Sequence, residues 1–355
     1  MNETEKVPVQ LGYSMPPEWT RHDATLLIWP HNRETWPGER LHLVEEVYLK
    51  IIETLHRYEP VHVLINSDSQ KKYVEQKLRT RELDTGQITL DVQPVNDVWV
   101  RDCGPIFINK NTSQFAVTNW GYNAWGGKYP PFDADNRIPS YISKTFNLDI
   151  FDPGMILEGG SVEVNGEGVL LTTESVLLNP NRNPELNKKE IEQKLYDYLG
   201  VKKFVWLTEG LAGDDTDGHI DDLARFINDY TIVTAVCDDP DDVNYPVLQE
   251  NLEILSAARN LQGNSFNIET LPMPSTRIQG TTVDGSEYVP ASYLNFYIAN
   301  GIVLLPFYDE QYDETVRRKF QNWFPDRDII GIHCHDLVWG QGSIHCITQQ
   351  MYFNR

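Results

Sequence analysis

Residues 41–65 read LHLVEEVYLKIIETLHRYEPVHVLI. In the first part of this stretch the apolar residues recur every three or four positions, as they do along one face of a helix: Val44, Val47, Tyr48, Ile51, Leu55 and Tyr58. Pro60 ends the helix, and the apolar run at 61–65 is typical of a buried strand. A helix followed directly by a strand predicts an α/β fold.

The same unit recurs along the chain. Further helices are expected at 138–146, 183–199, 246–261 and 310–323, where apolar residues keep the helical period. For the second of these, Asn183-Pro184 is a suitable N-cap and first-turn pair. Short strands are expected between the helices: 115–118, 162–164, 169–172, 204–207, 224–227, 231–236 and 329–332. Because no linker divides the chain, we predict one domain, 1–355, built of five similar modules.

The composition limits the possible partners. The chain has 355 residues, with 30 Lys and Arg against 52 Asp and Glu, which gives a net charge of -22. Nucleic acids and anionic membranes are poor partners for such a protein, whereas a small cation is a better one. The longest apolar runs have only strand length, and residues 1–10 are polar, so we expect a cytoplasmic protein with reduced cysteines.

The C-terminal segment 339–348, WGQGSIHCIT, carries the first candidate for chemistry. Gly340 and Gly342 permit a tight turn or close approach of a ligand, and Cys346 follows in a strand-like run. A cysteine thiolate is a strong nucleophile, although most lone cysteines are structural. Cys346 is therefore a candidate nucleophile.

A second segment, 216–222, reads TDGHIDD. If it is extended, His219 and Asp221 point to the same side, and a carboxylate beside an imidazole raises its pKa, as an acid–base catalyst requires. A calcium loop is the first alternative, but the residues around Gly218 do not fit the EF-hand pattern. An ordinary polar turn is the second.

Two further carboxylates complete the candidate site. In 97–105, DVWVRDCGP, an extended backbone would place Asp102 on the apolar face, where it needs a cationic partner. That partner is either the neighbouring Arg101 or a charged substrate. In 157–161, LEGGS, Glu158 is followed by two glycines that let a ligand approach the backbone.

These residues fall at comparable places in different modules, near strand ends. Modules arranged in a ring would bring Asp102, Glu158, His219 and Cys346 to one centre. Three carboxylates beside a thiol would repel an anion and suit a guanidinium, whose planar fork accepts bidentate contacts. The thiolate would then attack the central carbon, while His219 protonates the departing nitrogen and later activates water.

At these segments the chain resembles the agmatine deiminases, within the guanidine-modifying group that includes bacterial peptidylarginine deiminases. The matching stretches span nearly the whole chain: 99–105, 123–127, 157–160, 182–184, 218–222 and 344–350. The resemblance implies a five-bladed β/α-propeller of the pentein type with pseudo-fivefold symmetry, no metal and no organic cofactor. It also implies hydrolysis of agmatine to N-carbamoylputrescine and ammonia.

The resemblance assigns roles to individual residues. Cys346 would be the nucleophile that carries the amidino group, and His219 the acid and base. Asp102, Glu158 and Asp221 would hold the guanidinium, and Trp99 would line the site beside the substrate. Homo-oligomers are common in the family, so we expect that an assembly is possible here.

Several alternatives remain at this point. The substrate could be free or peptidyl arginine, although 111–136 contains only one basic residue, Lys128, to read a carboxylate. An amidinotransferase would use the same thiol and imidazole. A metal site is conceivable around 333–336 and His345-Cys346, without a standard ligand spacing. A non-catalytic binding protein is the last possibility.

Overall fold

The helix predicted from residue 41 forms as α1 (Arg40–Leu55), and strand β2 (Val61–Ile65) follows it. The computed structural model describes residues 6–275, 281–282 and 284–354. Four members of the predicted stripe are fully buried on α1 and Val47 is half-buried at its edge, whereas Tyr58, also half-buried, lies beyond the end of the helix at Leu55. The α/β class predicted from the sequence is confirmed.

The described residues form five small sheets. Four have three strands each, of which the first two are antiparallel and the third is parallel to the second. Their strands, sheet by sheet, are β4 (Ile106–Asn111), β5 (Gln114–Thr118), β6 (Asp149–Phe151); β7 (Glu163–Val164), β8 (Val169–Thr173), β9 (Lys203–Leu207); β10 (Ala224–Asn228), β11 (Thr231–Val236), β12 (Asn267–Pro272); β13 (Tyr297–Ala299), β14 (Ile302–Phe307), β15 (Asp328–His333).

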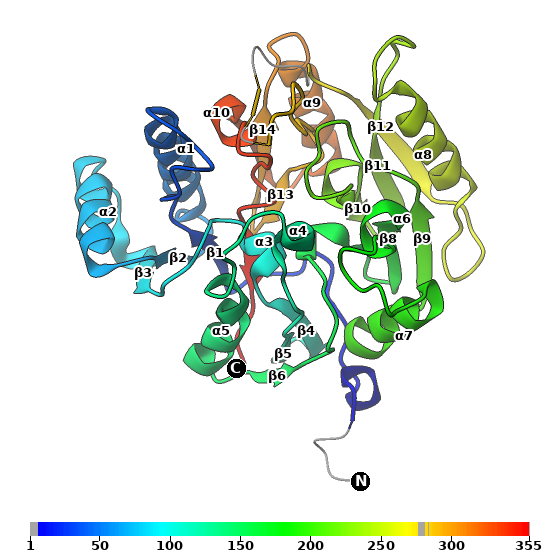
Figure 1. Cartoon of the computed structure of the whole chain (residues 1–355), viewed down its shortest axis with the longest axis horizontal. Helices are drawn as coiled ribbons and strands as arrows, with labels where there is room; N and C mark the ends of the chain where they lie inside the picture. Colours follow the sequence, from blue (N-terminus) through cyan, green and yellow to red (C-terminus); the bar gives the residue numbers. More distant parts are fainter. Residues whose placement is uncertain (1–5, 276–280, 283, 355) are drawn as a thin grey trace.

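The remaining sheet joins the two ends of the chain. Its order is β16 (Gln349–Met351), β1 (Ala24–Ile28), β2 and β3 (Ile88–Val92), with β16 antiparallel to β1 and the other pairs parallel. It repeats the pattern of the other four, with β3 added at its edge. Figure 1 shows the five sheets spread around the central helical turn α3 (Val100–Cys103).

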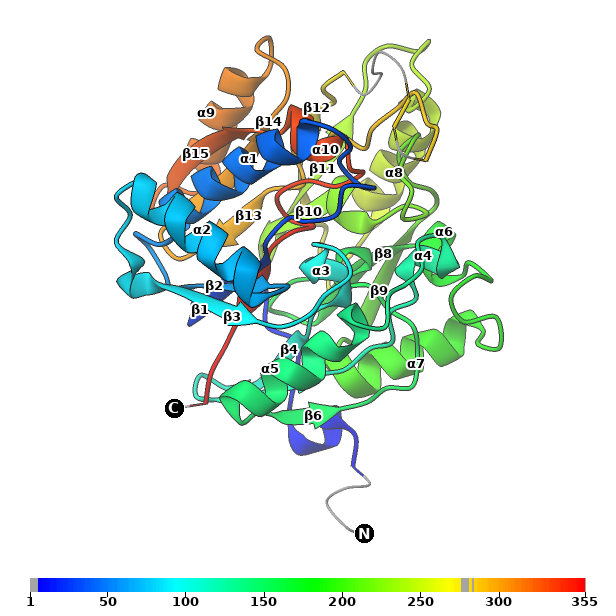
Figure 2. The ribbon, with the colours of Figure 1, turned by 60° about the vertical axis from the view of Figure 1, so that its left-hand side comes forward.

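One helix connects the last two strands of each repeated unit. Besides α1, these are α5 (Ile138–Phe146), α7 (Lys188–Leu199), α8 (Tyr245–Ala257) and α9 (Asp313–Trp323). In Figures 1 and 2 they lie on the outside of the molecule, whereas α3 lies near its middle. Short turns, rather than the crossover helices, therefore lie at the inner ends of the sheets.

Some predicted boundaries are wrong for local reasons. The helix α7 begins after Asn187, not Asn183, because Asn187 and Glu190 form a reciprocal capping box. The helix α8 ends at Ala257 rather than Leu261, and α9 begins at Asp313 rather than Glu310. The helix α2 (Asp68–Thr80) was not predicted, because it buries only Val74 and Leu78 and so lacks a clear apolar stripe.

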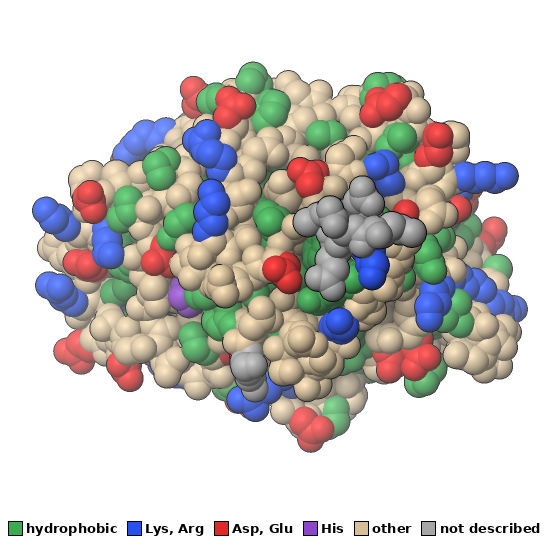
Figure 3. All heavy atoms as spheres, turned by 90° about the horizontal axis from the view of Figure 1, so that it is seen from below, with side chains coloured by type: hydrophobic (Ala, Val, Ile, Leu, Met, Phe, Trp, Pro, Cys, Tyr) green, Lys and Arg blue, Asp and Glu red, His purple; other side chains and the backbone are tan. Residues whose placement is uncertain are grey.

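The surface mixes charges of both signs. In the face shown in Figure 3, acidic and basic side chains are interspersed rather than gathered into one field. None of the described helices combines the length and the apolar character needed to cross a membrane.

A buried carboxylate, Glu18, ties several units together. Its Oε1 accepts a hydrogen bond from the Ile298 backbone N–H (2.8 Å) and lies 3.1 Å from Arg225 Nη2. Its Oε2 lies 3.3 Å from Arg101 Nη2 and 2.7 Å from His345 Nε2. Burial raises the pKa of Glu18, but Arg225, His345 and Arg101 outweigh burial and hold it well below its usual range.

We expect Glu18→Gln to destabilise the fold strongly. The substitution leaves buried cations without their shared carboxylate, and breaking a buried pair costs about 3–5 kcal/mol. The free energy of unfolding, measured by chemical denaturation, should fall by that amount. As a control, Glu174→Gln removes an exposed ion pair to Lys188 (2.6 Å) and should cost less than about 1 kcal/mol. Equal effects of the two substitutions would contradict a central role for Glu18.

Candidate active site

A cavity of about 710 Å³ opens beside the central turns. Its size is in the range of small-molecule sites. Its wall includes Trp99, Asp102 and Cys346, three residues singled out in the sequence, together with Trp125 and Tyr129. Glu158, His219 and Asp221 are not among the described wall residues, and each is at most 1% exposed. They lie buried next to Asp102 and Cys346, as the following contacts show.

Each predicted residue precedes the first strand of a sheet. Asp102 belongs to α3, just before β4, and Glu158 caps the turn η5 (Gly159–Ser161), just before β7. His219 caps the turn η6 (Ile220–Asp222), which contains Asp221 and precedes β10. Cys346 precedes β16. The turn η5 packs against both α3 and η6, so residues far apart in sequence become neighbours.

Asp102 is held by two donors. The Gly160 N–H donates to its Oδ1 (3.0 Å) and Trp125 Nε1 donates to its Oδ2 (3.0 Å). The expected extended backbone is wrong here, because residues 100–103 form a helical turn with all four side chains buried. Arg101 pairs with Glu18 and not with Asp102. Asp102 thus keeps its charge available at the cavity wall.

Only one of the two carboxylate oxygens of Glu158 has a hydrogen-bond partner among the described residues. Arg182 Nε donates to its Oε1 at 2.7 Å, whereas its buried Oε2 has no hydrogen-bond partner among the described residues. Gly160, two residues later, allows the neighbouring side chains to converge. A Cβ at this position would lie 2.6 Å from His219 Nδ1 and 2.8 Å from Asp102 Oδ1. Only glycine leaves room for this contact.

The expected extended segment ends at His219, whose backbone is extended, because Asp221 lies in the 3-10 turn that follows. His219 Nδ1 lies 3.6 Å from Asp102 Oδ1, and neither ring nitrogen has a hydrogen-bond partner in the described part of the chain. Asp221 Oδ2 lies 2.7 Å from His345 Nδ1, while its Oδ1 is also unpartnered there. Buried polar atoms of this kind normally find a partner, so they point to a ligand.

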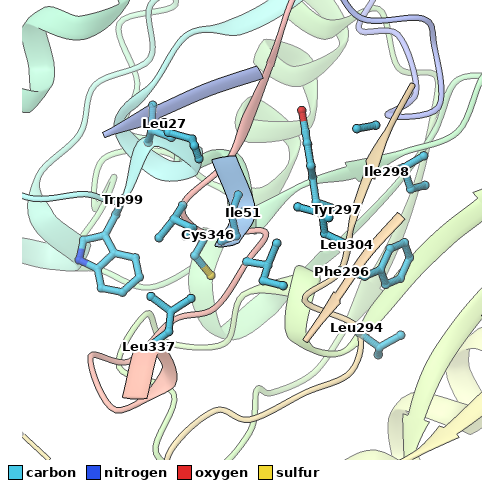
Figure 4. Packing of buried hydrophobic residues seen from close by; sticks show 14 of the residues in the cluster. Leu27, Ile51, Trp99, Leu294, Phe296, Tyr297, Ile298, Leu304, Leu337 and Cys346 are labelled. Carbon is cyan, nitrogen blue, oxygen red and sulfur yellow. The ribbon is translucent and has the colours of Figure 1, made fainter. Parts of the chain in front are cut away.

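Cys346 is packed between aromatic and polar groups. Its Sγ lies 3.9 Å from Asp221 Oδ2. A Cβ at Gly342 would lie 2.4 Å from the Trp99 ring and 3.1 Å from Cys346 Cβ, so this glycine lets the indole and the thiol share the space. Figure 4 shows Trp99 and Leu337 near the sulfur.

The sequence analysis missed Asn295. Its Nδ2 donates to Cys346 Sγ (3.2 Å) and to Asp222 Oδ1 (2.9 Å). Its Oδ1 accepts from the His345 N–H (2.8 Å), which fixes the orientation of the amide. Asn295 stands just before β13, the position that the candidate residues occupy in the other units. Its position just before the first strand of a sheet is the signal that could have identified Asn295.

The electrostatics favour a neutral resting thiol. Burial raises the pKa of Cys346 well above its ordinary value, and Asp221, Asp222 and Asp102 raise it further. Burial also raises the pKa of Asp102, to about 6, with Asp221 and Glu158 adding to the shift against His219 and Trp125. Burial lowers the pKa of His219, but Asp102, Asp221 and Glu158 outweigh it, and the net shift is upward. The carboxyl groups of Asp102, Asp221 and Asp222 therefore make the surroundings of the thiol acidic, which suits a cationic ligand.

The residues considered for a metal site do not converge. Asp336 pairs with Arg40 (2.7 Å), and His345 lies between Asp221 and Glu18. Cys334 is buried and its thiol points to the Ile332 carbonyl (3.2 Å). In the described ranges no group of three His, Cys, Asp or Glu side chains has the arrangement of a metal site.

Comparison with known families agrees with this arrangement. Residues 14–351 match the model of the Porphyromonas-type peptidyl-arginine deiminases. The chain belongs to this family. The match covers all of the candidate residues and both ends of the sheet that joins the termini.

Individual family members give the same picture. A Legionella pneumophila protein, provisionally named an agmatine deiminase, is 39% identical over 97% of this chain and 96% of its own length. The structure of the Enterococcus faecalis agmatine deiminase has a TM-score of 0.90 at 32% identity, over 99% of this chain and 98% of that one. A cysteine-to-serine variant of the C. jejuni agmatine deiminase, with substrate bound, has a TM-score of 0.85 at 30% identity, over 96% and 97%.

We expect slow alkylation of Cys346 at neutral pH. Since only the thiolate reacts, a raised pKa makes iodoacetamide labelling slow at pH 7, with a rate that climbs above about pH 9. Peptide mapping by mass spectrometry measures the rate at this residue, and Cys346→Ser supplies the unlabelled control. Rapid labelling near pH 6 would instead reveal a preformed thiolate–imidazolium pair with His219.

Proposed function

We propose that this family member hydrolyses agmatine to N-carbamoylputrescine and ammonia through an amidino-cysteine intermediate. The observation that carries the proposal is that Cys346 and Asp102 line one cavity, with His219 buried 3.6 Å from Asp102, and that three neighbouring carboxyl groups raise the pKa of the thiol. Relatives named agmatine deiminases over nearly the full length support the choice of substrate.

The proposal includes the architecture. Five sheets with a shared strand pattern, each preceded by a turn that supplies the site, fit a single-domain, five-bladed β/α-propeller with pseudo-fivefold symmetry. The chemistry needs a reduced Cys346, and all four cysteines of the chain are free. A cytoplasmic location and a homo-oligomer stay predictions that accompany the proposal.

The guanidinium binds at the floor of the cavity. Asp102 faces it from the wall, and the unpartnered oxygens of Glu158 and Asp221 accept its remaining N–H groups. The indoles of Trp99 and Trp125 stand T-shaped with ring centres 6.3 Å apart, so one ring offers its face to the flat cation while the other meets it edge-on. These contacts place the central carbon of the guanidinium before Cys346 Sγ.

The bound cation starts the chemistry. Its positive charge lowers the pKa of the Cys346 thiol, whose proton passes to solvent through the cavity, and the Asn295 amide donates to the sulfur as negative charge develops. An S–C bond forms, and protonated His219 gives its proton to one terminal nitrogen. The C–N bond breaks, ammonia leaves, and a thiouronium remains on Cys346.

Water completes the cycle. Neutral His219 takes a proton from the water, whose oxygen forms a bond to the amidino carbon. The S–C bond then breaks, the sulfur leaves as the thiolate and is reprotonated, and the carbonyl of N-carbamoylputrescine is formed. One water is consumed, and one ammonia and the proton released by the thiol leave together as ammonium, so the protein returns to its starting state.

The cavity wall favours an amine-ended substrate over arginine. Lys128 is already engaged, since its Nζ donates to Asp215 O (2.6 Å) and to Asp217 Oδ1 (2.9 Å). The other strongly basic wall residue, Arg33, is exposed beside the carboxylate-bearing Glu34. A buried carboxylate reader is thus lacking on the described wall, whereas an ammonium finds acidic neighbours.

We expect ammonia release from agmatine to exceed release from arginine or arginyl peptides. An enzymatic ammonia assay over this substrate panel measures the ratio of kcat/KM values. Cys346→Ala should lower the rate with agmatine by at least about 10⁴-fold, since it removes the nucleophile. A rate for arginine equal to that for agmatine would overturn the substrate assignment but not the reaction class.

The same assay separates hydrolysis from amidino transfer. With an added acceptor amine, ammonia and the carbamoyl product should be unchanged. An amidinated acceptor formed at the expense of the carbamoyl product would identify a transferase instead.

We also expect kcat/KM to fall as the pH drops below about 6. Asp102 must be ionised to hold the guanidinium, and its pKa in the free protein is about 6, so protonation removes the contact. A kcat/KM profile between pH 4.5 and 9 measures this limb. Asp102→Asn should be weakly active and should lose the limb. A wild-type profile that stays flat through pH 5 would contradict this role.

A further inference from the structure

His345 is adjacent to Cys346, yet its ring faces the interior. The residue is 1% exposed and is not among the described wall residues of the cavity. Its Nδ1 lies 2.7 Å from Asp221 Oδ2, and its Nε2 lies 2.7 Å from Glu18 Oε2. The reaction steps above use neither nitrogen, so this buried ring needs an explanation of its own.

Both neighbours of the ring are ionised carboxylates. Burial raises the pKa of Asp221, but the hydrogen bond from His345 and the charges of His345, His219 and Arg225 outweigh burial and lower it. Glu18 is kept ionised by Arg225, His345 and Arg101. Ionised carboxylates only accept hydrogen bonds, so the ring must donate from both nitrogens. The ring thus bridges the carboxylates of Asp221 and Glu18, with one nitrogen on each.

The contact determines which oxygen of Asp221 is free. Its Oδ2 is occupied by His345, and its Oδ1 is buried without a hydrogen-bond partner among the described residues. A carboxylate held at one oxygen cannot rotate to satisfy the other. The free oxygen is thus left for a ligand that enters from the cavity.

The backbone of His345 fixes two more neighbours. Its N–H donates to Asn295 Oδ1 (2.8 Å), which aims the Asn295 amide at the sulfur, and its carbonyl accepts from Arg101 Nε (3.3 Å). The residue therefore connects the Glu18 cluster in the interior with the groups around Cys346.

We infer that His345 is a positioning residue, whose doubly hydrogen-bonded ring anchors Asp221 to Glu18 and presents the free carboxylate oxygen to the guanidinium. This inference rests on the proposed function, because it assigns Asp221 to a guanidinium substrate. His345 touches neither the substrate nor the reacting atoms.

The test is the His345→Gln variant assayed with agmatine from pH 4.5 to 9. Glutamine can reach one carboxylate but cannot hold both, so Asp221 is free to turn. Misplacement of this kind costs about 10²-fold. We expect that loss mainly in kcat, because Asp102 and Glu158 still bind the cation.

His22→Gln is the matched control. His22 is a buried imidazole that also lies between a carboxylate, Glu59 Oε1 (3.3 Å), and Glu18, here its carbonyl (2.7 Å). Its contacts do not include Asp221. It should lower the melting temperature but leave kcat and the acid limb unchanged. Equal losses in the two variants, or wild-type kinetics in His345→Gln, would overturn the inference.

The outcomes also separate this inference from the proposed function. Wild-type protein that releases no ammonia from any guanidine refutes the proposed function itself. If His345→Gln does not fold, ¹⁵N-histidine NMR of the Cys346→Ser protein gives an independent test. We expect the His345 ring to carry hydrogen on both nitrogens, with and without agmatine. A neutral tautomer in either state would overturn the inference.

Discussion

The structure depends on one buried anion and the cations that surround it. Glu18 meets Arg101 from the turn before β4, Arg225 from β10, and His345 from the segment before β16, while the Ile298 N–H of β13 donates to it. No two of these contacts come from the same sheet. A single carboxylate near the middle thus fixes the relative positions of several units, and an error in any one would leave a buried charge uncompensated.

The same arrangement determines the character of the cavity floor. The interior arginines pair with carboxylates away from the ligand, Arg101 and Arg225 with Glu18 and Arg225 also with Glu163 (2.9 Å), while His345 occupies one oxygen of Asp221. Asp102 and the unpartnered Oδ1 of Asp221 therefore remain as acidic groups near Cys346. Together with burial, these acidic groups raise the pKa of the Cys346 thiol, and a cationic ligand would lower it.

Much of this was accessible from the sequence, because the helical period and strand lengths predict five helix–strand units. The candidate residues were found one by one, from unusual chemistry at strand ends. The features that could not be predicted depend on tertiary contacts. Backbone conformation at Asp102 and Asp221 follows from the packing of the turns, the start of α7 from a capping box, and the role of Asn295 from contacts with residues distant in sequence. The partner of Arg101 could not be foreseen because Glu18 lies in another part of the chain.

The pairing of β16 with β1 has a consequence for biosynthesis. The strand that closes the first sheet comes from residues 349–351, and the sulfur lies just before it. A nascent chain in which residues 346–351 are still inside the ribosome has neither the closing strand nor the thiol in place. The site therefore becomes complete only after the strands of the four other sheets have been synthesised.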